Sequence, residues 1–295
     1  MKLLNKASLS QVGLLVATII WGSAFCVMKD TLNTIPTNFL LAIRFSVAAI
    51  ILSLVFIRKF RFLNMGYILR GLVLGAFLYI AYAFQTYGLA DTTPGKNAFL
   101  TAVYCIIVPF LYAALKRRLP DKFSIIASIF CIGGIGFVSL NGNLSISIGD
   151  ILTLGCGLFY AMHIVAVAKF SKDYDPILLT IFQFFFAGIF GWIGGGFSEK
   201  FPTVWSPSVI MSLLYLSIFA TAIALLLQNI GQKYTHPATA SIILSLESVF
   251  GVVFSAIFGY EVLSPKTFLG FVLIFVAIII SETKLSFLRK KVSKQ

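Results

Sequence analysis

The chain has 295 residues, of which 59% are apolar and only 11% are charged. Soluble proteins carry roughly 25% charged residues, so this composition excludes a soluble globular fold and a soluble catalytic domain. The formal net charge of +13 does not indicate a nucleic-acid partner, because the basic residues lie in short segments between long apolar runs.

Apolar segments of similar length follow one another along the whole chain. A helix needs roughly 20 residues to span a hydrocarbon core of about 30 Å, and prolines stand at or near the starts of several segments, where a missing N–H costs little. The sequence therefore predicts an all-α integral membrane protein with ten transmembrane helices. The segments cover residues 11–29, 36–57, 66–88, 95–115, 122–140, 147–169, 176–197, 208–232, 238–258 and 264–283.

The basic residues are distributed unevenly between the two sides of these segments. With the N-terminus placed in the cytoplasm, 18 of the 23 Lys and Arg residues fall on the cytoplasmic side, four fall on the other, and Arg44 lies within a segment. Cytoplasmic loops carry such an excess of positive charge. We therefore expect a multi-pass protein of the cell inner (plasma) membrane with both termini cytoplasmic.

A short pattern recurs in the two halves of the chain. QTYGLADTTP (85–94) and QNIGQKYTHP (228–237) share Gln, Gly, Thr and Pro in register at an offset of 143 residues. Five helices per repeat is an odd number, so the second copy enters the membrane from the opposite side. The sequence thus predicts two inverted five-helix repeats around a central cavity, at 1–141 and 147–283, followed by a basic cytoplasmic tail at 284–295.

Several motifs resemble one known family. TIIWGSAF (18–25), AIRF (42–45), NAFLTAVYCIIVPFLYAAL (97–115) and the helix pair at 234–280, which contains Glu247 and Glu261, are similar to the EamA-type permeases of the drug/metabolite transporter superfamily. The resemblance covers essentially the whole chain. It implies ten helices around a central cavity and the export of amino acids or related metabolites. Two residues depart from the family pattern, namely Ser248, where Pro is frequent, and Arg118 at an acidic position.

Three ionisable residues within the predicted spans are candidates for substrate binding or coupling. Such residues are costly in a membrane and need a partner or a cavity. Arg44 either binds substrate or snorkels to the outer interface. Glu247 is the natural carrier of a proton or ligand of a cationic group, or else a structural acid in an ion pair or hydrogen bond. His163 titrates near neutral pH in an ordinary environment, but a lone His among apolar residues also serves as a hydrogen-bonded packing residue.

Amide and aromatic side chains complete the candidate set. Amides do not favour lipid and should face the bundle interior, where they either join helices or bind substrate. Aromatic rings can line an amphipathic cavity, although most of the 30 phenylalanines must pack or face lipid. The candidates are Gln85, Asn97, Gln183 and Gln228 among the amides, and Trp21, Tyr79, Tyr82, Tyr104 and Tyr160 among the aromatics.

These features predict a secondary transporter of small metabolites that works by alternating access, with the export of amino acids or related compounds as the first hypothesis. The chain has no Walker-type sequence, which disfavours ATP-driven primary transport. Proton exchange or facilitated diffusion would then move the solute. The alternatives are an importer or exchanger of a vitamin, nucleotide sugar or organic anion, a channel, and an intramembrane enzyme or lipid-handling protein. An enzyme is disfavoured because His-Glu-x-x-His and Gly-x-Ser-x-Gly are missing.

The expected partners are a small-molecule substrate, a proton as the candidate coupling ion, and the lipid bilayer, with the chain as a monomer or homodimer. The four cysteines, Cys26, Cys105, Cys131 and Cys156, are scattered through apolar segments without Cys-x-x-Cys spacing. We therefore expect neither a metal site nor a disulfide framework, and no cofactor.

Overall fold

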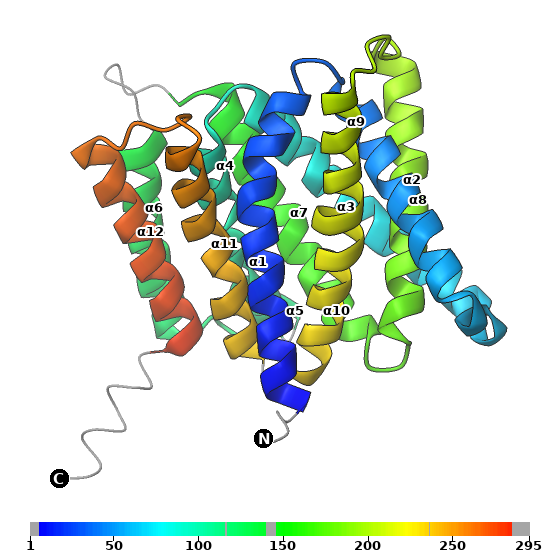
Figure 1. Ribbon diagram of the computed structural model, residues 1–295. Coiled ribbons are helices and arrows are strands. Elements are labelled where there is room, and N and C mark those ends of the chain that lie inside the picture. The colour runs from blue at the N-terminus through cyan, green and yellow to red at the C-terminus, as the bar shows by residue number, and fades with distance from the viewer. Residues whose placement is uncertain (1–5, 116, 140–145, 236, 285–295) are drawn as a thin grey trace, which may run out of the picture.

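The computed structural model describes residues 6–115, 117–139, 146–235 and 237–284, and the regular elements in these ranges are all helices (Figure 1). The basic tail expected at 284–295 falls outside the described residues except for Lys284. In chain order the elements are α1 (Lys6–Thr31), α2 (Thr37–Val55), the 3₁₀ helix η1 (Ile57–Phe62), α3 (Met65–Ala90), α4 (Pro94–Thr101), α5 (Tyr104–Leu115), α6 (Lys122–Ser139), α7 (Ile148–Phe170), α8 (Pro176–Ser198), α9 (Pro207–Leu214), the π-helix η2 (Tyr215–Ile223), α10 (Ala224–Tyr234), α11 (Pro237–Ile257) and α12 (Pro265–Thr283).

These elements form the ten predicted membrane-spanning segments. Within the described residues, seven spans are long and apolar enough to cross a membrane, and three shorter apolar helices at 122–138, 243–257 and 265–280 supply the others. The predicted all-helical membrane fold is confirmed. It follows that any chemistry of this chain takes place inside the bundle or at its two ends.

Proline and capping residues begin the helices where the sequence indicates. Pro94, Pro176, Pro207, Pro237 and Pro265 are the first residues of their helices, where proline loses no hydrogen bond. A side-chain oxygen of the preceding residue accepts a backbone N–H from the first turn in four of these helices. The capping residues are Thr93, Asp175, Ser206 and Ser264.

Two of the spans are not regular α-helices, which their apolar pattern did not indicate. The fourth span is divided at Ala102 and Val103 into α4 and α5. The eighth span changes from α9 to the π-helical η2 and back to α10. Irregular helical turns of this kind are frequent at functional sites, and both lie beside the cavity described below.

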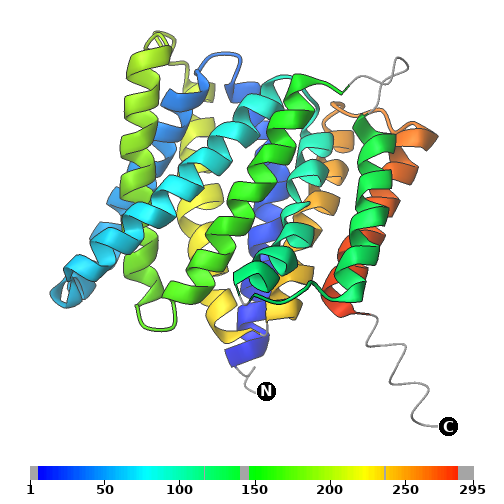
Figure 2. The same ribbon diagram turned by 180° about the vertical axis from the view of Figure 1, so that it is seen from behind.

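The two halves of the chain run in opposite directions and interlock. In Figures 1 and 2, α1 begins at the end of the bundle where α12 finishes, whereas α7 begins at the opposite end. The most extensive helix pairings across the halves are α6 with α12, α3 with α7, α2 with α8, α1 with α11, and α3 with α8, followed by α1 with α10. These pairings persist when equivalent helices of the two halves are exchanged, as an inverted repeat requires.

Two glycines show the repeat at the level of single contacts. Gly88 on α3 lies so close to α7 that an added Cβ would be 2.3 Å from Thr153 Oγ1. Its counterpart Gly231 on α10 lies against α1, where an added Cβ would be 2.7 Å from Leu14 Cδ2. Thr153 and Leu14 are themselves equivalent at an offset of 139 residues. At both crossings the neighbouring helix occupies the space that a side chain would need.

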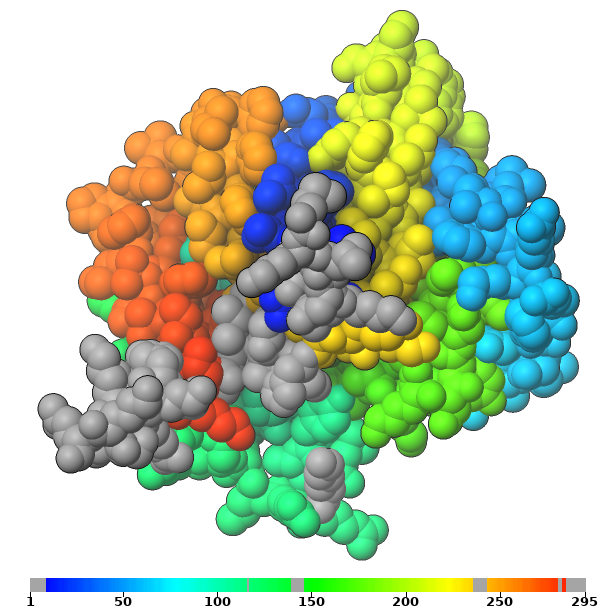
Figure 3. All heavy atoms as spheres, turned by 60° about the horizontal axis from the view of Figure 1, so that its bottom comes forward, coloured from blue at the N-terminus to red at the C-terminus, as the bar shows by residue number. Residues whose placement is uncertain are grey.

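The two ends of the bundle are named here by the chain termini. The terminal face is the end at which α1 begins and α12 finishes, and the distal face is the opposite end (Figure 1). Viewed toward the terminal face, the turn between α2 and α3 lies at one edge and α12 at the opposite edge (Figure 3).

Candidate substrate-binding cavity

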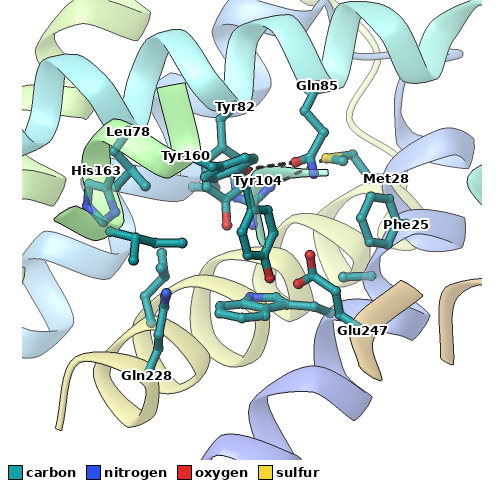
Figure 4. A pocket seen from close by; sticks show the side chains of 15 residues that line it. Phe25, Met28, Leu78, Tyr82, Gln85, Tyr104, Tyr160, His163, Gln228 and Glu247 are labelled. Carbon is teal, nitrogen blue, oxygen red and sulfur yellow. Dashed lines mark hydrogen bonds between the residues drawn. The ribbon is translucent and has the colours of Figure 1, made fainter. Parts of the chain in front are cut away.

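A cavity lies between the two halves and is lined by side chains from α1, α2, α3, α5, α7, α10 and α11 (Figure 4). The space between these side chains is about 590 Å³, including the part that opens to solvent. The lining residues are Trp21, Ala24, Phe25, Met28, Arg44, Leu78, Tyr82, Gln85, Tyr104, Tyr160, His163, Ile164, Leu225, Gln228 and Glu247.

Twelve of the fifteen lining residues are pairs related by the inverted repeat. On the first helix of each half the offset is 139 residues, and on the third and fourth spans it is 143, the offset of the sequence repeat. These twelve residues form two equivalent surfaces whose chemistry has diverged, and the other three, Met28, Arg44 and Leu78, come from the first half. The pairs are Trp21 with Tyr160, Ala24 with His163, Phe25 with Ile164, Tyr82 with Leu225, Gln85 with Gln228, and Tyr104 with Glu247.

Hydrogen bonds hold the amide of Gln85 in the cavity wall. Tyr160 donates its hydroxyl proton to Gln85 Oε1 at 2.9 Å, as the dashed line in Figure 4 shows. Gln85 Nε2 donates to Thr101 Oγ1 at 3.2 Å, and Asn97 Nδ2 donates to the backbone carbonyl of Gln85 at 3.1 Å. Asn97 also donates to Thr153 Oγ1 at 2.8 Å. These bonds join α3, α4 and α7 at one side of the cavity.

The acid of the cavity, Glu247, comes from α11 and is 6% exposed. The hydroxyl of Tyr104, its repeat equivalent, points toward the Glu247 carboxylate (Figure 4). Three ion pairs join described residues, and Glu247 is in none of them. The carboxylate therefore faces the cavity beside a phenol rather than a fixed cation.

The cation of the cavity, Arg44, comes from α2 and is 2% exposed, so its side chain remains inside the bundle and does not reach an interface. Its Nε donates to Thr221 Oγ1 at 2.8 Å, and Nη1 lies 3.4 Å from Met28 Sδ. Like Glu247, Arg44 takes part in none of the three described ion pairs.

Of the twelve residues selected from sequence, nine line the cavity, and three lie outside it. Asn97 supports Gln85 as described above. Gln183 lies behind His163, with His163 Nε2 3.0 Å from Gln183 Oε1. Tyr79 donates to Asn38 Oδ1 at 2.8 Å and so joins α3 to the beginning of α2. These three residues are placed to hold helices or other side chains in position.

The cavity also contains apolar residues that were not selected from sequence. Phe25, Met28, Leu78 and Leu225 line it, but nothing distinguishes them from the many apolar residues that pack or face lipid. Applying the repeat offsets to the selected residues would have identified Leu225 as the counterpart of Tyr82. Met28 and Leu78 have no such signal.

Polar contacts join α4 and the residue after α3 to the beginning of α7 near the distal face. Lys96 Nζ on α4 forms an ion pair with Asp150 Oδ2 on α7 at 2.7 Å, and the Asp150 side chain is fully buried. Asp91 Oδ2, just after α3, accepts the backbone N–H of Gly149 at 3.0 Å. Both acids lie at the N-terminus of α7, where the helix dipole favours negative charge. We call the Lys96–Asp150 pair the distal latch.

The described residues contain no cluster of three or more His, Cys, Asp and Glu side chains that could hold a metal ion. The four cysteines are free and buried.

Two interlocked inverted halves around an amphipathic cavity define a membrane transporter. The model of the EamA-like transporter family matches residues 9–140 and again residues 147–283. The chain belongs to the EamA-like transporter family, a family of transporters and not of enzymes.

Similar proteins agree with this classification. An uncharacterized transporter of Archaeoglobus fulgidus is 32% identical over 272 residues, which are 92% of this chain and 85% of that protein. The uncharacterized transporter YvbV of Bacillus subtilis is 25% identical over 272 residues, covering 90% and 89% of the two chains. A solved crystal structure of a protein superimposes with a TM-score of 0.69 at 14% identity, over 95% of this chain and 99% of the other. The last match supports the fold alone.

Proposed function

We propose that this protein is a secondary transporter that exports amino acids or related small metabolites by alternating access. The observation that carries the proposal is one cavity, built from equivalent positions of two inverted halves, that contains a buried arginine from the first half and a buried glutamate from the second. Two equivalent halves around one site can open it to either side at similar energy.

The chemistry of the lining is matched to a zwitterion. An amino acid carries a carboxylate, an ammonium group and a side chain that is often apolar. Arg44 is a donor for the first, the Glu247 carboxylate is an acceptor for the second, and Trp21, Tyr104 and Tyr160 supply aromatic surface for the third. Burial strengthens both charged contacts because water competes less for them.

Competition for Glu247 supplies a mechanism for coupling. A carboxylate that holds either a proton or the ammonium group of a substrate, but not both, carries one of them in each direction as the cavity alternates. An inward proton gradient would then drive the substrate outward. Without such a gradient the same cycle exchanges substrates or equilibrates one of them across the membrane.

We further propose that the terminal face is cytoplasmic, because the basic residues gather there. The protein would then lie in the cell inner membrane with both termini in the cytoplasm, and export would run from the terminal to the distal face. Labelling of single cysteines placed in the turns, in intact cells with an impermeant maleimide, tests this orientation. Labelling of the α2–α3 turn from outside the cell would contradict it.

A second candidate function is import or exchange of a vitamin, a nucleotide sugar or an organic anion. The observation that favours it is Arg44, a buried cation without an ion-pair partner among the described residues. Under this reading Glu247 would be protonated whenever the anion is bound.

Counterflow uptake into liposomes reconstituted with the purified protein separates these candidates. Labelled amino acids, a nucleotide sugar and riboflavin would be compared with and without a proton gradient. We expect saturable amino-acid uptake above protein-free liposomes, increased by the gradient. If no amino acid is taken up but a vitamin or nucleotide sugar is, the amino-acid proposal is refuted and the second candidate is favoured.

The paired glutamines test whether both halves bind solute. We expect Gln85→Leu and Gln228→Leu to reduce amino-acid counterflow to a similar extent, each by about tenfold, the equivalent of one hydrogen bond of roughly 1.4 kcal/mol. Asn229→Leu, next to Gln228 but outside the lining, is the control for general loss of a buried amide. Strongly unequal losses for the two glutamines would mean that only one half contacts the solute.

A further inference from the structure

We propose that Arg44 binds the carboxylate of the transported solute and that Thr221, on the π-helical segment η2, positions its guanidinium for this purpose. The inference rests on the proposed function in that it assigns a group of the solute to one wall of the same cavity. It requires a carboxylate on the solute, whatever the rest of the solute is.

The first observation is the environment of the charge. Arg44 is 2% exposed and lines the cavity. Its guanidinium has five N–H donors, and the described hydrogen bonds use Nε, toward Thr221 Oγ1, and Nη1, toward Met28 Sδ. Both acceptors are uncharged. The fork of Nη1 and Nη2 is the part of the side chain that binds a carboxylate with two parallel hydrogen bonds.

The second observation is how the guanidinium is held. Its central carbon lies 4.7 Å from the centroid of the Tyr82 ring and 5.8 Å from that of Phe45. Cation–π contacts of this kind stabilise a buried cation without neutralising it. A charge that costs several kcal/mol to desolvate is therefore kept in the cavity wall in a fixed orientation, with no counter-charge among the described ion pairs.

The third observation is the π-helical segment itself. Thr221 Oγ1 accepts from Arg44 Nε and donates at 2.7 Å to the Leu216 carbonyl, five residues earlier. The adjacent carbonyl of Ala220 accepts the indole N–H of Trp21 at 2.9 Å. Two successive residues of η2 therefore hold two lining side chains that come from different helices. π-helical turns are frequent at functional sites, and this one carries both acceptors.

Together these observations distinguish a binding site from a structural arginine. A structural arginine pairs with a carboxylate of the chain or has its donors taken up by backbone carbonyls. Arg44 instead contacts a hydroxyl, a thioether and two aromatic rings at the wall of a cavity, and the groups that contact it fix its plane. The chemical class that completes this site is a carboxylate.

The test is equilibrium binding to the purified full-length protein in lipid nanodiscs, followed by isothermal titration calorimetry. The probes are the L-amino acids, beginning with L-phenylalanine, and three analogues of it. L-phenylalaninamide lacks the carboxylate, phenethylamine lacks the whole carboxyl group, and 3-phenylpropionate lacks the amine. We expect carboxylate probes to bind at least about tenfold more tightly than the amide, as expected for a charge-assisted pair.

Two sets of variants assign the effect to residues. Arg44→Gln should weaken the binding of the carboxylate probes by at least about tenfold. Arg44→Lys should recover part of this affinity, because it keeps the positive charge but replaces the forked guanidinium by a point charge. Thr221→Val should weaken carboxylate probes several-fold and leave phenethylamine unchanged, whereas Thr221→Ser should restore binding. Thr180→Val, a buried threonine of α8 outside the lining, is the matched control for loss of a hydroxyl.

The outcomes separate this inference from the proposed function. Arg44-dependent binding of 3-phenylpropionate without preference for any amino acid would support the carboxylate site and refute the amino-acid proposal. Equal binding of acid and amide, undiminished binding in Arg44→Gln, or no binding of any carboxylate probe would overturn the inference. If Thr221→Val weakens the binding of the carboxylate probes and of phenethylamine equally, Thr221 only supports the fold.

Discussion

Replacement of Glu247 by glutamine is expected to abolish proton-driven transport and to leave the bundle folded. Glutamine has nearly the same shape and keeps a hydrogen-bonding partner for Tyr104, but it cannot take up or release a proton. Accumulation of amino acid in proteoliposomes under a proton gradient should fall from the wild-type level to that of protein-free liposomes. The folded state is checked by gel filtration and thermal unfolding, in which the variant should match the wild type.

A matched acid provides the control for this experiment. Glu261 lies beyond the end of α11, where its Oε2 accepts from Ser255 Oγ at 3.1 Å, and it does not line the cavity. We expect Glu261→Gln to retain proton-driven transport. The other titratable or charged lining residues are Arg44, Tyr82, Tyr104, Tyr160 and His163. If transport by Glu247→Gln still depends on pH, coupling would be assigned to one of these residues instead.

Loss of Lys96 is expected to destabilise the protein more than loss of Asp150. The Asp150 side chain is fully buried, whereas the Lys96 side chain is 17% exposed. In Lys96→Met a carboxylate is left buried without its cation, at a cost of about 3 kcal/mol. In Asp150→Asn the lysine can turn toward solvent, so the cost is smaller. The double variant should be more stable than Lys96→Met alone, because no uncompensated charge remains.

Thermal or denaturant unfolding of the four proteins in detergent measures this difference. The control is Lys59→Met, which breaks the pair of Lys59 and Asp175 at the terminal face. Both of its side chains are 33% exposed, so the expected cost is below about 1 kcal/mol. Equal destabilisation by Lys96→Met and Lys59→Met, or a double variant that is no more stable than Lys96→Met, would show that the distal latch contributes little.

The architecture could be predicted because its determinants are local and repetitive. The length of a membrane span follows from the thickness of the bilayer, and the prolines and caps that begin helices act within a single turn. The offset between the QTYGLADTTP and QNIGQKYTHP segments and an odd number of helices per half are enough to imply inverted topology. None of these inferences needs a contact between distant residues.

The candidate site was only partly predictable for the opposite reason. Polar residues inside spans must avoid lipid, so their type showed that Gln85, Asn97 and Gln183 face the interior. It did not show that Gln85 lines the cavity while the other two stand behind it. That distinction depends on how the first half packs against α7 and α8, which is a property of the assembled bundle.

The sequence by itself determined the ten spans, the inverted repeat and the family resemblance, since hydropathy, span length and motif spacing act along the chain. Only the tertiary structure decided which side chains share the cavity. It brought Arg44 of α2 onto Thr221 of η2, 177 residues away, and left Glu247 opposite its repeat equivalent Tyr104 (Figure 4). The π-helical turn that holds Arg44 has no signature in the apolar pattern of Tyr215–Ile223.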